Sequence, residues 1–293
     1  MLGTRCFNVM IKTTFLGVDE VSYDETDVVI LPVPYDAMTS YQAGTRNGPA
    51  AILAASQQVE FYDAELKKEI PECAKIFTAP FLEPDKSSPK AMMDQVEATI
   101  GEILDAKKLP VMLGGDHSLS IGSTLAFAKR YPQAGILHLD AHSDLRESWE
   151  GSEYSHASSM RHALAKGLKL VSVGVRSTSR EIEEELPQEW QSRRKVFWAP
   201  HVPVLEIVKE LPEHIYVSID IDVFDPSLMP AVGTPEPGGL LWHDVLALLK
   251  AVAKERKVLG FDVMELSPIS GIHHPEFTAA RLITKFLGYI YCK

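Results

Sequence analysis

The strongest constraint on this chain is an apolar run at residues 214–217 that leads into the acidic stretch SIDIDVFDP at residues 218–226. A run of β-branched residues that ends in acidic ones is typical of a buried strand that carries carboxylates at its carboxyl end. Alternate residues of a strand share a face, so we expect Asp220 and Asp222 to point the same way. Because two carboxylates held this close disfavour each other's ionisation, we expect a positive charge between them, and a metal ion is the simplest one.

Two other predicted strands end in the same kind of residue. Residues 135–139 lead into Asp140, His142 and Asp144, and residues 110–113 lead into Gly-Gly-Asp followed by His117. Four carboxylates and two imidazoles suit hard or borderline divalent cations. A single catalytic ion that keeps an open position cannot use six ligands, so we expect two ions with bridging carboxylates. The predicted ligands are His117, Asp140, His142, Asp144, Asp220 and Asp222.

Strand and helix patterns alternate along the chain. Strands are predicted at residues 26–33, 74–78, 110–113, 135–140, 170–175, 195–198, 214–222 and 258–263, and the main helices near 49–54, 89–107, 118–130, 157–166, 179–185, 242–255 and 277–291. This alternation predicts an α/β fold: a single-domain, three-layer α/β/α structure with a mostly parallel sheet of about eight strands. Such sheets bind ligands beyond the carboxyl ends of their strands, where all six predicted ligands fall.

Composition narrows the class of protein. With 293 residues, 45% of them hydrophobic, the chain can bury a large core. The net charge of −11 argues against nucleic acid or an anionic membrane as a partner. No apolar run approaches the length of a membrane span, and no signal-peptide pattern opens the chain. Three widely spaced cysteines, Cys6, Cys73 and Cys292, indicate a reduced, cytoplasmic protein rather than a disulfide framework.

The motifs GGDHS, DAHSD and SIDIDVFDP, in this order, resemble the three signature motifs of the ureohydrolase family, which includes arginases and agmatinases. The resemblance runs from about Val28 to the C-terminus and includes AGTRNGP at residues 43–49, GTPEPGGL at 233–240 and DVME at 262–265. We therefore divide the chain into an N-terminal extension, residues 1–25, with Met10 as an alternative start, and a ureohydrolase domain, residues 26–293.

The resemblance implies an arginase-like fold and two Mn²⁺ ions per subunit, and it suggests a homotrimer or homohexamer. It implies that one ion is held by His117, Asp140, Asp144 and Asp220. The other would be held by Asp140, His142, Asp220 and Asp222, so that Asp140 and Asp220 bridge the pair.

The resemblance also implies three catalytic residues. The match to His156 shuttles a proton to the leaving amine, a role that suits an imidazole because its pKa lies near neutrality. The match to Glu265 forms a salt bridge with the substrate guanidinium, which a carboxylate can contact through two parallel hydrogen bonds. Asp144 would orient the attacking hydroxide. Read alone, His156 would be a solvated loop residue and Glu265 a turn carboxylate.

Several polar residues admit two interpretations. Strand alternation places His138 on the face of Asp140, but we favour a core histidine with its hydrogen bonds satisfied. Asp116 is expected to lie behind a ligand or to form a turn, and Asp225 to form a turn. Arg46 would line the entrance or pair with a neighbouring acid.

The predicted reaction is hydrolysis of a guanidino group to urea and an amine, with agmatine the expected small cationic substrate. Glu147, Glu150 and Glu153 make the loop after the DAHSD motif acidic, which would attract an alkylammonium tail. Arg146 in the same loop would instead favour 4-guanidinobutyrate or another guanidino acid over the amine. Arginine is less expected as a substrate. Two different classes of protein stay open: a phosphate-ester hydrolase, and a catalytically inactive, metal-binding relative.

Overall fold

The computed structural model describes residues 13–19 and 21–292, and its centre is an eight-stranded sheet. The strand order is β4-β1-β5-β10-β9-β6-β7-β8, and every pairing in this sheet is parallel. The strands are β1 (Val28–Pro32), β4 (Ile76–Thr78), β5 (Leu109–Leu113), β6 (Gly135–Leu139), β7 (Lys169–Val175), β8 (Arg194–Trp198), β9 (His214–Asp220) and β10 (Lys257–Met264). All eight strands predicted from the sequence are therefore present in one sheet.

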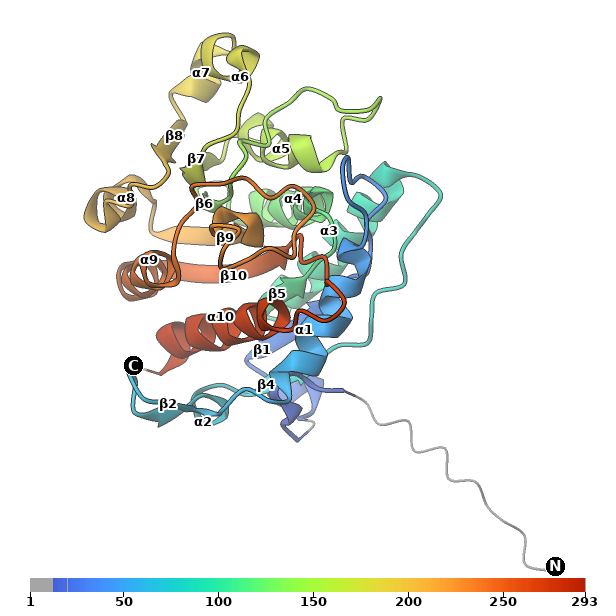
Figure 1. Ribbon diagram of the computed structural model, residues 1–293, viewed down its shortest axis with the longest axis vertical. Helices are drawn as coiled ribbons and strands as arrows, with labels where there is room; N and C mark the ends of the chain where they lie inside the picture. The colour runs from blue at the N-terminus through green and yellow to red at the C-terminus, as the bar shows by residue number, and fades with distance from the viewer. Residues whose placement is uncertain (1–12, 20, 293) are drawn as a thin grey trace, which may run out of the picture.

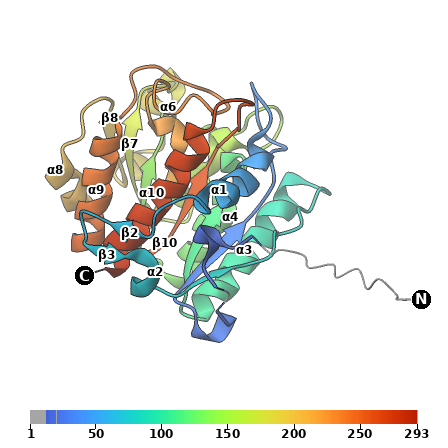
Figure 2. The same ribbon diagram turned by 60° about the horizontal axis from the view of Figure 1, so that its bottom comes forward.

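Helices cover both faces of this sheet (Figure 1). They are α1 (Gly48–Ser56), α2 (Ile70–Cys73), α3 (Pro89–Asp105), α4 (Ser120–Arg130), α5 (Ser159–Ala165), α6 (Arg180–Glu184), α7 (Gln188–Gln191), α8 (Val204–Glu210), α9 (Trp242–Glu255) and α10 (His274–Tyr291). One layer contains α3, α4 and α5, and the other contains α1, α8, α9 and α10. Figure 2 shows α1, α9 and α10 side by side over one face.

The side chains of each strand divide between two separate cores because successive residues point to opposite faces. In β1, Val28 and Ile30 join the core under α1, α9 and α10, whereas Val29 and Leu31 join the core under α3, α4 and α5. All five residues of β1 are buried. A strand covered on both sides needs a continuous apolar run, which is the pattern that the sequence shows. The predicted three-layer α/β/α fold is confirmed.

Helix α3 illustrates how the local sequence sets an element. Ser88 caps its first turn by accepting a hydrogen bond from the backbone N–H of Ala91 at 3.1 Å. Pro89 occupies the first helical position, where its missing N–H costs nothing. The buried residues recur at helical spacing and face α4 and the sheet: Met92, Met93, Val96, Ile100, Gly101, Ile103 and Leu104.

Some short elements were not predicted. They are the hairpin of β2 (Tyr62–Asp63) and β3 (Lys68–Glu69), the helices α2, α7 and α8, and six short 3-10 helices, η1 (Phe15–Gly17), η2 (Tyr23–Glu25), η3 (Thr45–Asn47), η4 (His117–Leu119), η5 (His156–Ser158) and η6 (Ile221–Val223). Apart from α8, which has seven residues, these elements have two to four residues, too few positions to show a hydrophobic period.

The described part of the N-terminal extension packs against the domain. Phe15 and Leu16 are buried in the core that includes α1. The backbone N–H of Phe15 donates to Thr78 Oγ1 at 2.8 Å, and that of Leu16 donates to Ser56 Oγ at 2.9 Å. Met10, the alternative start, lies outside the described residues. Among the described residues, no helix is both long and apolar enough to cross a membrane.

Cys73 and Cys292 form a disulfide, with their Cα atoms 5.2 Å apart. For these two residues the expectation of reduced cysteines was wrong. The reason is that α2 packs against α10, which brings together residues that are 219 positions apart in the sequence. Gly288 of α10 leaves the space that Ile70 of α2 and Leu66 occupy. Cys6 lies outside the described residues.

We predict that Cys73→Ser destabilises the oxidised protein. The crosslink closes a very long loop, and loss of such a constraint on the unfolded chain lowers the free energy of unfolding by about 2–5 kcal/mol. Urea unfolding with and without a thiol reductant measures this. Reductant should destabilise the wild type by a similar amount and leave Cys73→Ser unchanged; equal stability of all four samples would contradict the prediction.

Candidate metal centre and active site

Four neighbouring strands, β5, β10, β9 and β6, carry the predicted ligands and Glu265 at their carboxyl ends. His117 lies in η4, just after β5; Asp140 follows β6; Asp220 ends β9; and Asp222 lies in η6. His142 and Asp144 follow on the loop beyond β6. Five of these six side chains are buried, and His142 is 24% exposed. The structure therefore brings all six predicted ligands to one edge of the sheet.

The first cluster surrounds His117. Its Nδ1 atom lies 3.0 Å from Asp140 Oδ2 and 3.2 Å from both Asp144 Oδ2 and Asp220 Oδ2. Despite these short distances, Nδ1 is buried without a hydrogen-bond partner. A buried nitrogen that faces three carboxylates and makes no hydrogen bond is suited to share a cation with them.

The second cluster shares Asp140 with the first. His142 Nδ1 lies 2.9 Å from Asp222 Oδ2 and 3.4 Å from Asp140 Oδ1. The ligand atoms of these three residues all lie within 4.8 Å of one another, as do those of a group formed by His117, Asp140, Asp144 and His138. Two overlapping clusters are the arrangement that two ions with a bridging carboxylate require.

Asp222 reaches the site by a route that strand alternation does not describe. Strand β9 ends at Asp220, and the chain then turns into η6. Asp220 Oδ1 caps this turn by accepting from the backbone N–H of Asp222 at 2.8 Å. Asp222 Oδ1 accepts from the backbone N–H of Ala141 at 3.0 Å, which ties η6 to the loop after β6. The convergence of the two carboxylates was predicted, but its geometric reason was wrong.

The far side of the His117 ring is held by a buried polar network. Nε2 lies 2.9 Å from Ser218 Oγ, and the Ser218 hydroxyl donates to Asp262 at 2.8 Å. Because Ser218 uses its proton on Asp262, it accepts from Nε2–H, which leaves Nδ1 as the ring nitrogen that could bind a cation. Asp262 is fully buried and also accepts from Ser120 and Tyr216. The sequence patterns did not indicate Ser218 and Asp262.

His138 is a fully buried core residue and also contacts a ligand. Its Nε2 lies 2.8 Å from Asp140 Oδ2, and its Nδ1 lies 3.2 Å from Ser172 Oγ. Both ring nitrogens are thus satisfied, as we expected, yet the ring holds the carboxylate that the two clusters share. The alternation that placed His138 on the face of Asp140 was the signal for this contact.

Burial and charge shift the pKa values of the histidines strongly. Burial alone would lower the pKa of His117, but the carboxylates of Asp140, Asp144 and Asp220 outweigh it and hold that pKa well above its usual value. Burial opposes protonation of His142 as well, but Asp222 and Asp140 raise its pKa to about 12. Without metal, therefore, the imidazoles carry protons that supply the missing positive charge.

Three carboxylates of the site have raised pKa values. They are Asp220, Asp222 and Glu265, and burial is the main cause for each. Neighbouring carboxylates raise these pKa values further: Asp222 and Asp140 act on Asp220, and Asp140 acts on Asp222. Asp116 acts on Glu265 in the same way. The pKa of Asp140 is held well below its usual range, because His138, His117 and His142 outweigh its burial. A site with this excess of negative charge fits divalent cations, and its donors are the oxygen and imidazole groups that such ions take.

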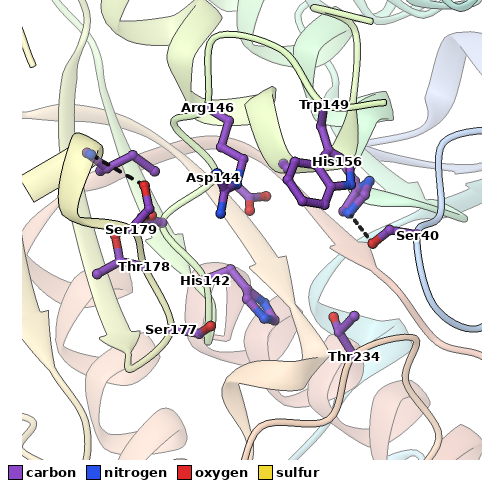
Figure 3. Close-up of a pocket in the computed structure, with 13 residues that line it drawn as sticks. Ser40, His142, Asp144, Arg146, Trp149, His156, Ser177, Thr178, Ser179 and Thr234 are labelled. Carbon is purple, nitrogen blue, oxygen red and sulfur yellow. Dashed lines mark hydrogen bonds between the residues drawn. The ribbon is translucent and has the colours of Figure 1, made fainter. Parts of the chain in front are cut away.

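Two of the predicted ligands, His142 and Asp144, line a cavity of about 170 Å³ (Figure 3). His142, Asp144, Arg146, Trp149 and His156 line it, together with Ser40, Ser143, Ala157, Ser177, Thr178, Ser179, Ile182 and Thr234. His156 Nε2 lies 3.1 Å from Ser40 Oγ, and its Nδ1 lies 3.3 Å from Ser155 Oγ. The sequence patterns did not indicate Ser40 or Trp149, whose indole N–H is buried without a hydrogen-bond partner.

Glu265 lies beside His117 rather than in the lining of the cavity. Its Oε1 accepts a hydrogen bond from the backbone N–H of His117 at 2.8 Å. Glu265 and Asp144 both adopt left-handed backbone conformations, with φ values of 68° and 51°. Non-glycine residues in this region are uncommon and gather at functional sites, where the surrounding structure holds them in place.

A close backbone contact fixes the turn that carries His117. Gly115 lies so near the backbone of Tyr35 that a Cβ atom there would overlap the Tyr35 carbonyl. The backbone N–H of Asp116 donates to the same carbonyl at 2.9 Å. Asp116 then caps η4 and accepts from the backbone N–H of Met38, so it acts as a buried turn former behind His117.

Two further charged residues take one of the roles expected for them. Arg46 pairs with Asp36 at 2.5 Å, which decides its two interpretations in favour of a neighbouring acid. Asp225 forms a turn by accepting from Ser227 and from the backbone of the 238–239 turn.

The acidic loop does not line the cavity. Glu147, Glu150 and Glu153 are exposed, and none of them belongs to the cavity lining. Arg146 does belong to it, with its guanidinium 4.6 Å from the centre of the Trp149 ring. The lining of the cavity therefore does not support the expectation that these glutamates attract an alkylammonium tail.

The parallel sheet carries at its carboxyl edge two overlapping clusters whose donors could hold two metal ions, as in a metal-dependent hydrolase. The profile of the Arginase family matches residues 26–288. The chain belongs to this family, and it is a ureohydrolase of the agmatinase type.

Relatives and solved structures agree with this assignment. The chain is 39% identical to an N(1)-aminopropylagmatine ureohydrolase of Thermus thermophilus, over 93% of each chain. It is 37% identical to an agmatinase of Pyrococcus horikoshii, over 92% of this chain and 93% of the relative. The solved agmatine ureohydrolase of Thermoplasma volcanium is similar with a TM-score of 0.86 and 28% identity, covering 96% of this chain and 95% of that one.

We predict that Mn²⁺ binding to the metal-free protein tightens as the pH rises from 6 to 8. The raised pKa values of His117 and His142 mean that both imidazoles are protonated near neutrality, and each must lose a proton to bind an ion. Calorimetry in two buffers of different ionisation enthalpy should detect release of on the order of one proton per ion. Binding that is independent of pH and releases no protons would contradict the prediction.

Proposed function

We propose that this enzyme hydrolyses the guanidino group of agmatine to urea and putrescine, with two Mn²⁺ ions as its cofactor. The observation that carries this proposal is the pair of clusters that share Asp140, beside a buried carboxylate, Glu265. A homotrimer or homohexamer remains our prediction for its assembly.

The division of the ligands between the two ions is the one that the family resemblance implies. His117, Asp140, Asp144 and Asp220 would hold one ion, and Asp140, His142, Asp220 and Asp222 the other. The unpartnered Nδ1 of His117 and the excess of buried carboxylates support this division. Manganese is preferred over zinc because the set is rich in carboxylates. When bound, such ions lower the pKa of a water molecule, so that a nucleophile is present at neutral pH.

Glu265 would bind the guanidinium. Its burial, together with Asp116, raises its pKa by more than the neighbouring His117 lowers it, so a further positive charge would favour the ionised carboxylate. A planar guanidinium supplies that charge and can form two parallel hydrogen bonds with a carboxylate. Asp144 lines the cavity and would orient the attacking oxygen by accepting its proton in a hydrogen bond.

His156 would protonate the nitrogen that leaves. It lines the same cavity as His142 and Asp144, and Ser40 contacts its Nε2 atom. Departure of the amine requires a proton on its nitrogen, and a positioned imidazole can supply one near neutral pH.

We predict that His156→Ala lowers kcat by roughly 10²–10⁴-fold, the usual range for a positioned acid or base, with two Mn²⁺ still bound. His162→Ala is a matched control, because His162 contacts the Glu153 carbonyl outside the cavity. Urea release at saturating substrate and metal analysis give the two readouts. Unchanged turnover of His156→Ala would show that the leaving group takes its proton from elsewhere.

The proposal that the substrate has an alkylamine tail is supported by the names of the relatives. An agmatinase of Bacillus anthracis is 38% identical over 85% of this chain and 86% of its own, close to the figure for the Pyrococcus horikoshii agmatinase. Arg146 in the cavity lining is the main counter-argument, since a guanidinium could bind the carboxylate of 4-guanidinobutyrate. Its position over Trp149 supports a stacked rather than an ion-paired role.

A second candidate substrate is N(1)-aminopropylagmatine. Four relatives named as its ureohydrolases, at 34–39% identity, support it. It carries the same guanidinobutyl group as agmatine, so the proposed chemistry is identical and only the contacts beyond the cavity differ.

A urea-release assay with Mn²⁺ across a panel of guanidino compounds tests the proposal. We predict that kcat/KM for agmatine exceeds that for arginine and for 4-guanidinobutyrate by at least about tenfold. N(1)-aminopropylagmatine in the same panel decides between the two amines.

Two variants make this panel sharper. Arg146→Ala removes the cationic group of the cavity, and Arg161→Ala is its control, because Arg161 stacks on Trp190 at 4.8 Å outside the lining. Faster turnover of 4-guanidinobutyrate that only Arg146→Ala abolishes would refute the amine substrates and leave the ureohydrolase chemistry in place.

A further inference from the structure

Arg176, which the sequence patterns did not single out, donates to six backbone carbonyls. Its Nη2 donates to Asp222 at 2.7 Å, to Glu236 at 2.8 Å and to Phe224 at 3.2 Å. Its Nε and Nη1 atoms donate to the carbonyls of Gly174, Val223, Glu236 and Pro237, at 3.1–3.3 Å. One half-buried guanidinium thus joins three segments: the end of β7, the η6 turn and the 233–240 loop.

A bulge in β7 gives Arg176 this position. The register between β7 and β8 shifts between Val173 and Val175, and Gly174 between them has φ +94°. A Cβ atom on Gly174 would lie 2.6 Å from the side chain of Val223, so only glycine lets η6 approach here.

The backbone at Arg176 contacts the other side of the same cluster. The N–H groups of Arg176 and Ser177 both donate to the Ala141 carbonyl, at 2.8 and 2.9 Å. Ser177 and His142 then pair as an isolated parallel bridge. The backbone of residues 176–177 therefore holds the segment of His142, while the Arg176 side chain holds that of Asp222.

We propose that Arg176 is the positioning residue of the second metal cluster: it fixes His142 and Asp222 relative to each other and to the 233–240 loop. This inference rests on the proposed two-ion site. Both residues come from turns rather than from the sheet, so the ladder of backbone hydrogen bonds does not set their separation. A guanidinium suits this task because its five donors spread in a fixed plane, whereas a lysine ammonium acts as a single point charge.

The hydrogen bonds of Arg176 also hold a loop that contributes to the cavity. The 233–240 loop carries Thr234, which lines the cavity, and Glu236, whose carboxylate lies 4.0 Å from His142 Nε2. Arg176 holds this loop through the carbonyls of Glu236 and Pro237. Loss of the guanidinium should therefore weaken both the second ion and the fit of the substrate.

Metal titration of the stripped protein tests this inference. Arg176→Ala should weaken one of the two Mn²⁺ sites by about 10–100-fold, the usual effect of removing a group that orients a ligand, and leave the other site within about twofold. Arg176→Lys keeps the charge but not the planar fork, so its affinity should fall between those of the wild type and Arg176→Ala, and it covers the case in which Arg176→Ala does not fold. When excess Mn²⁺ fills both sites of Arg176→Ala, its KM for agmatine should still be higher than that of the wild type.

Arg256→Ala is the matched control. Arg256 also donates to backbone carbonyls, those of Leu211, Val208 and Glu255, but it joins α8 to α9 away from the site. This variant should lose thermal stability and keep both ions. The inference is wrong if Arg176→Ala binds both ions as the wild type does, or if Arg256→Ala loses the second ion equally. A wild type that binds a single ion would overturn the two-ion site and this inference with it.

Discussion

Repulsion among buried carboxylates is the constraint on which the rest of this structure depends. Asp140, Asp220 and Asp222 lie within reach of one another at one edge of the sheet, where burial removes the water that would otherwise screen them. Protons on His117 and His142 would offset part of this charge, and the neighbouring carboxylates raise the pKa values of both imidazoles. Divalent ions would offset the negative charge of these carboxylates more completely, because each carries two positive charges and the clustered side-chain atoms face a common point. The buried carboxylates of this site therefore favour a cation among them.

Two large apolar cores, one on each face of the sheet, stabilise the fold against the repulsion among these carboxylates. Strands β5, β10, β9 and β6 are neighbours in the sheet although β10 comes last in the chain, so crossover connections bring distant segments to one edge. Each strand is fixed by apolar residues on both faces, and only its carboxyl end carries polar groups. The residues that hold the ligands are equally buried: Ser218 and Asp262 orient His117, and His138 holds Asp140. Hydrogen bonds from buried residues behind His117 and Asp140 therefore fix the positions of these two predicted ligands.

The sequence predicted the strands and their polar ends well, because both rest on local patterns. The sequence did not predict side-chain positions that depend on the three-dimensional course of turns and loops. Asp222 was placed by strand alternation, but it reaches the site through a 3-10 turn that Asp220 caps. The charge of the loop after β6 was visible, but which side chains face the cavity was not, and Arg146 rather than the glutamates lines it. Arg176 was not singled out for the same reason, because nothing in the sequence near an arginine at a strand end shows that five carbonyls of distant segments accept its hydrogen bonds.

The disulfide between Cys73 and Cys292 makes most of the chain a covalent ring. Every ligand, the catalytic candidates and the loop that carries Arg146 belong to the part that it closes, whose ends are 219 positions apart. One cut in the peptide backbone inside this ring, for example in the exposed turn at Glu150 and Gly151, would open the ring without releasing a fragment. The two pieces would stay joined through sulfur, and strands β5, β6, β9 and β10 would remain in one molecule. Under oxidising conditions a nicked enzyme would thus migrate as an intact chain, and only a reductant would reveal the break.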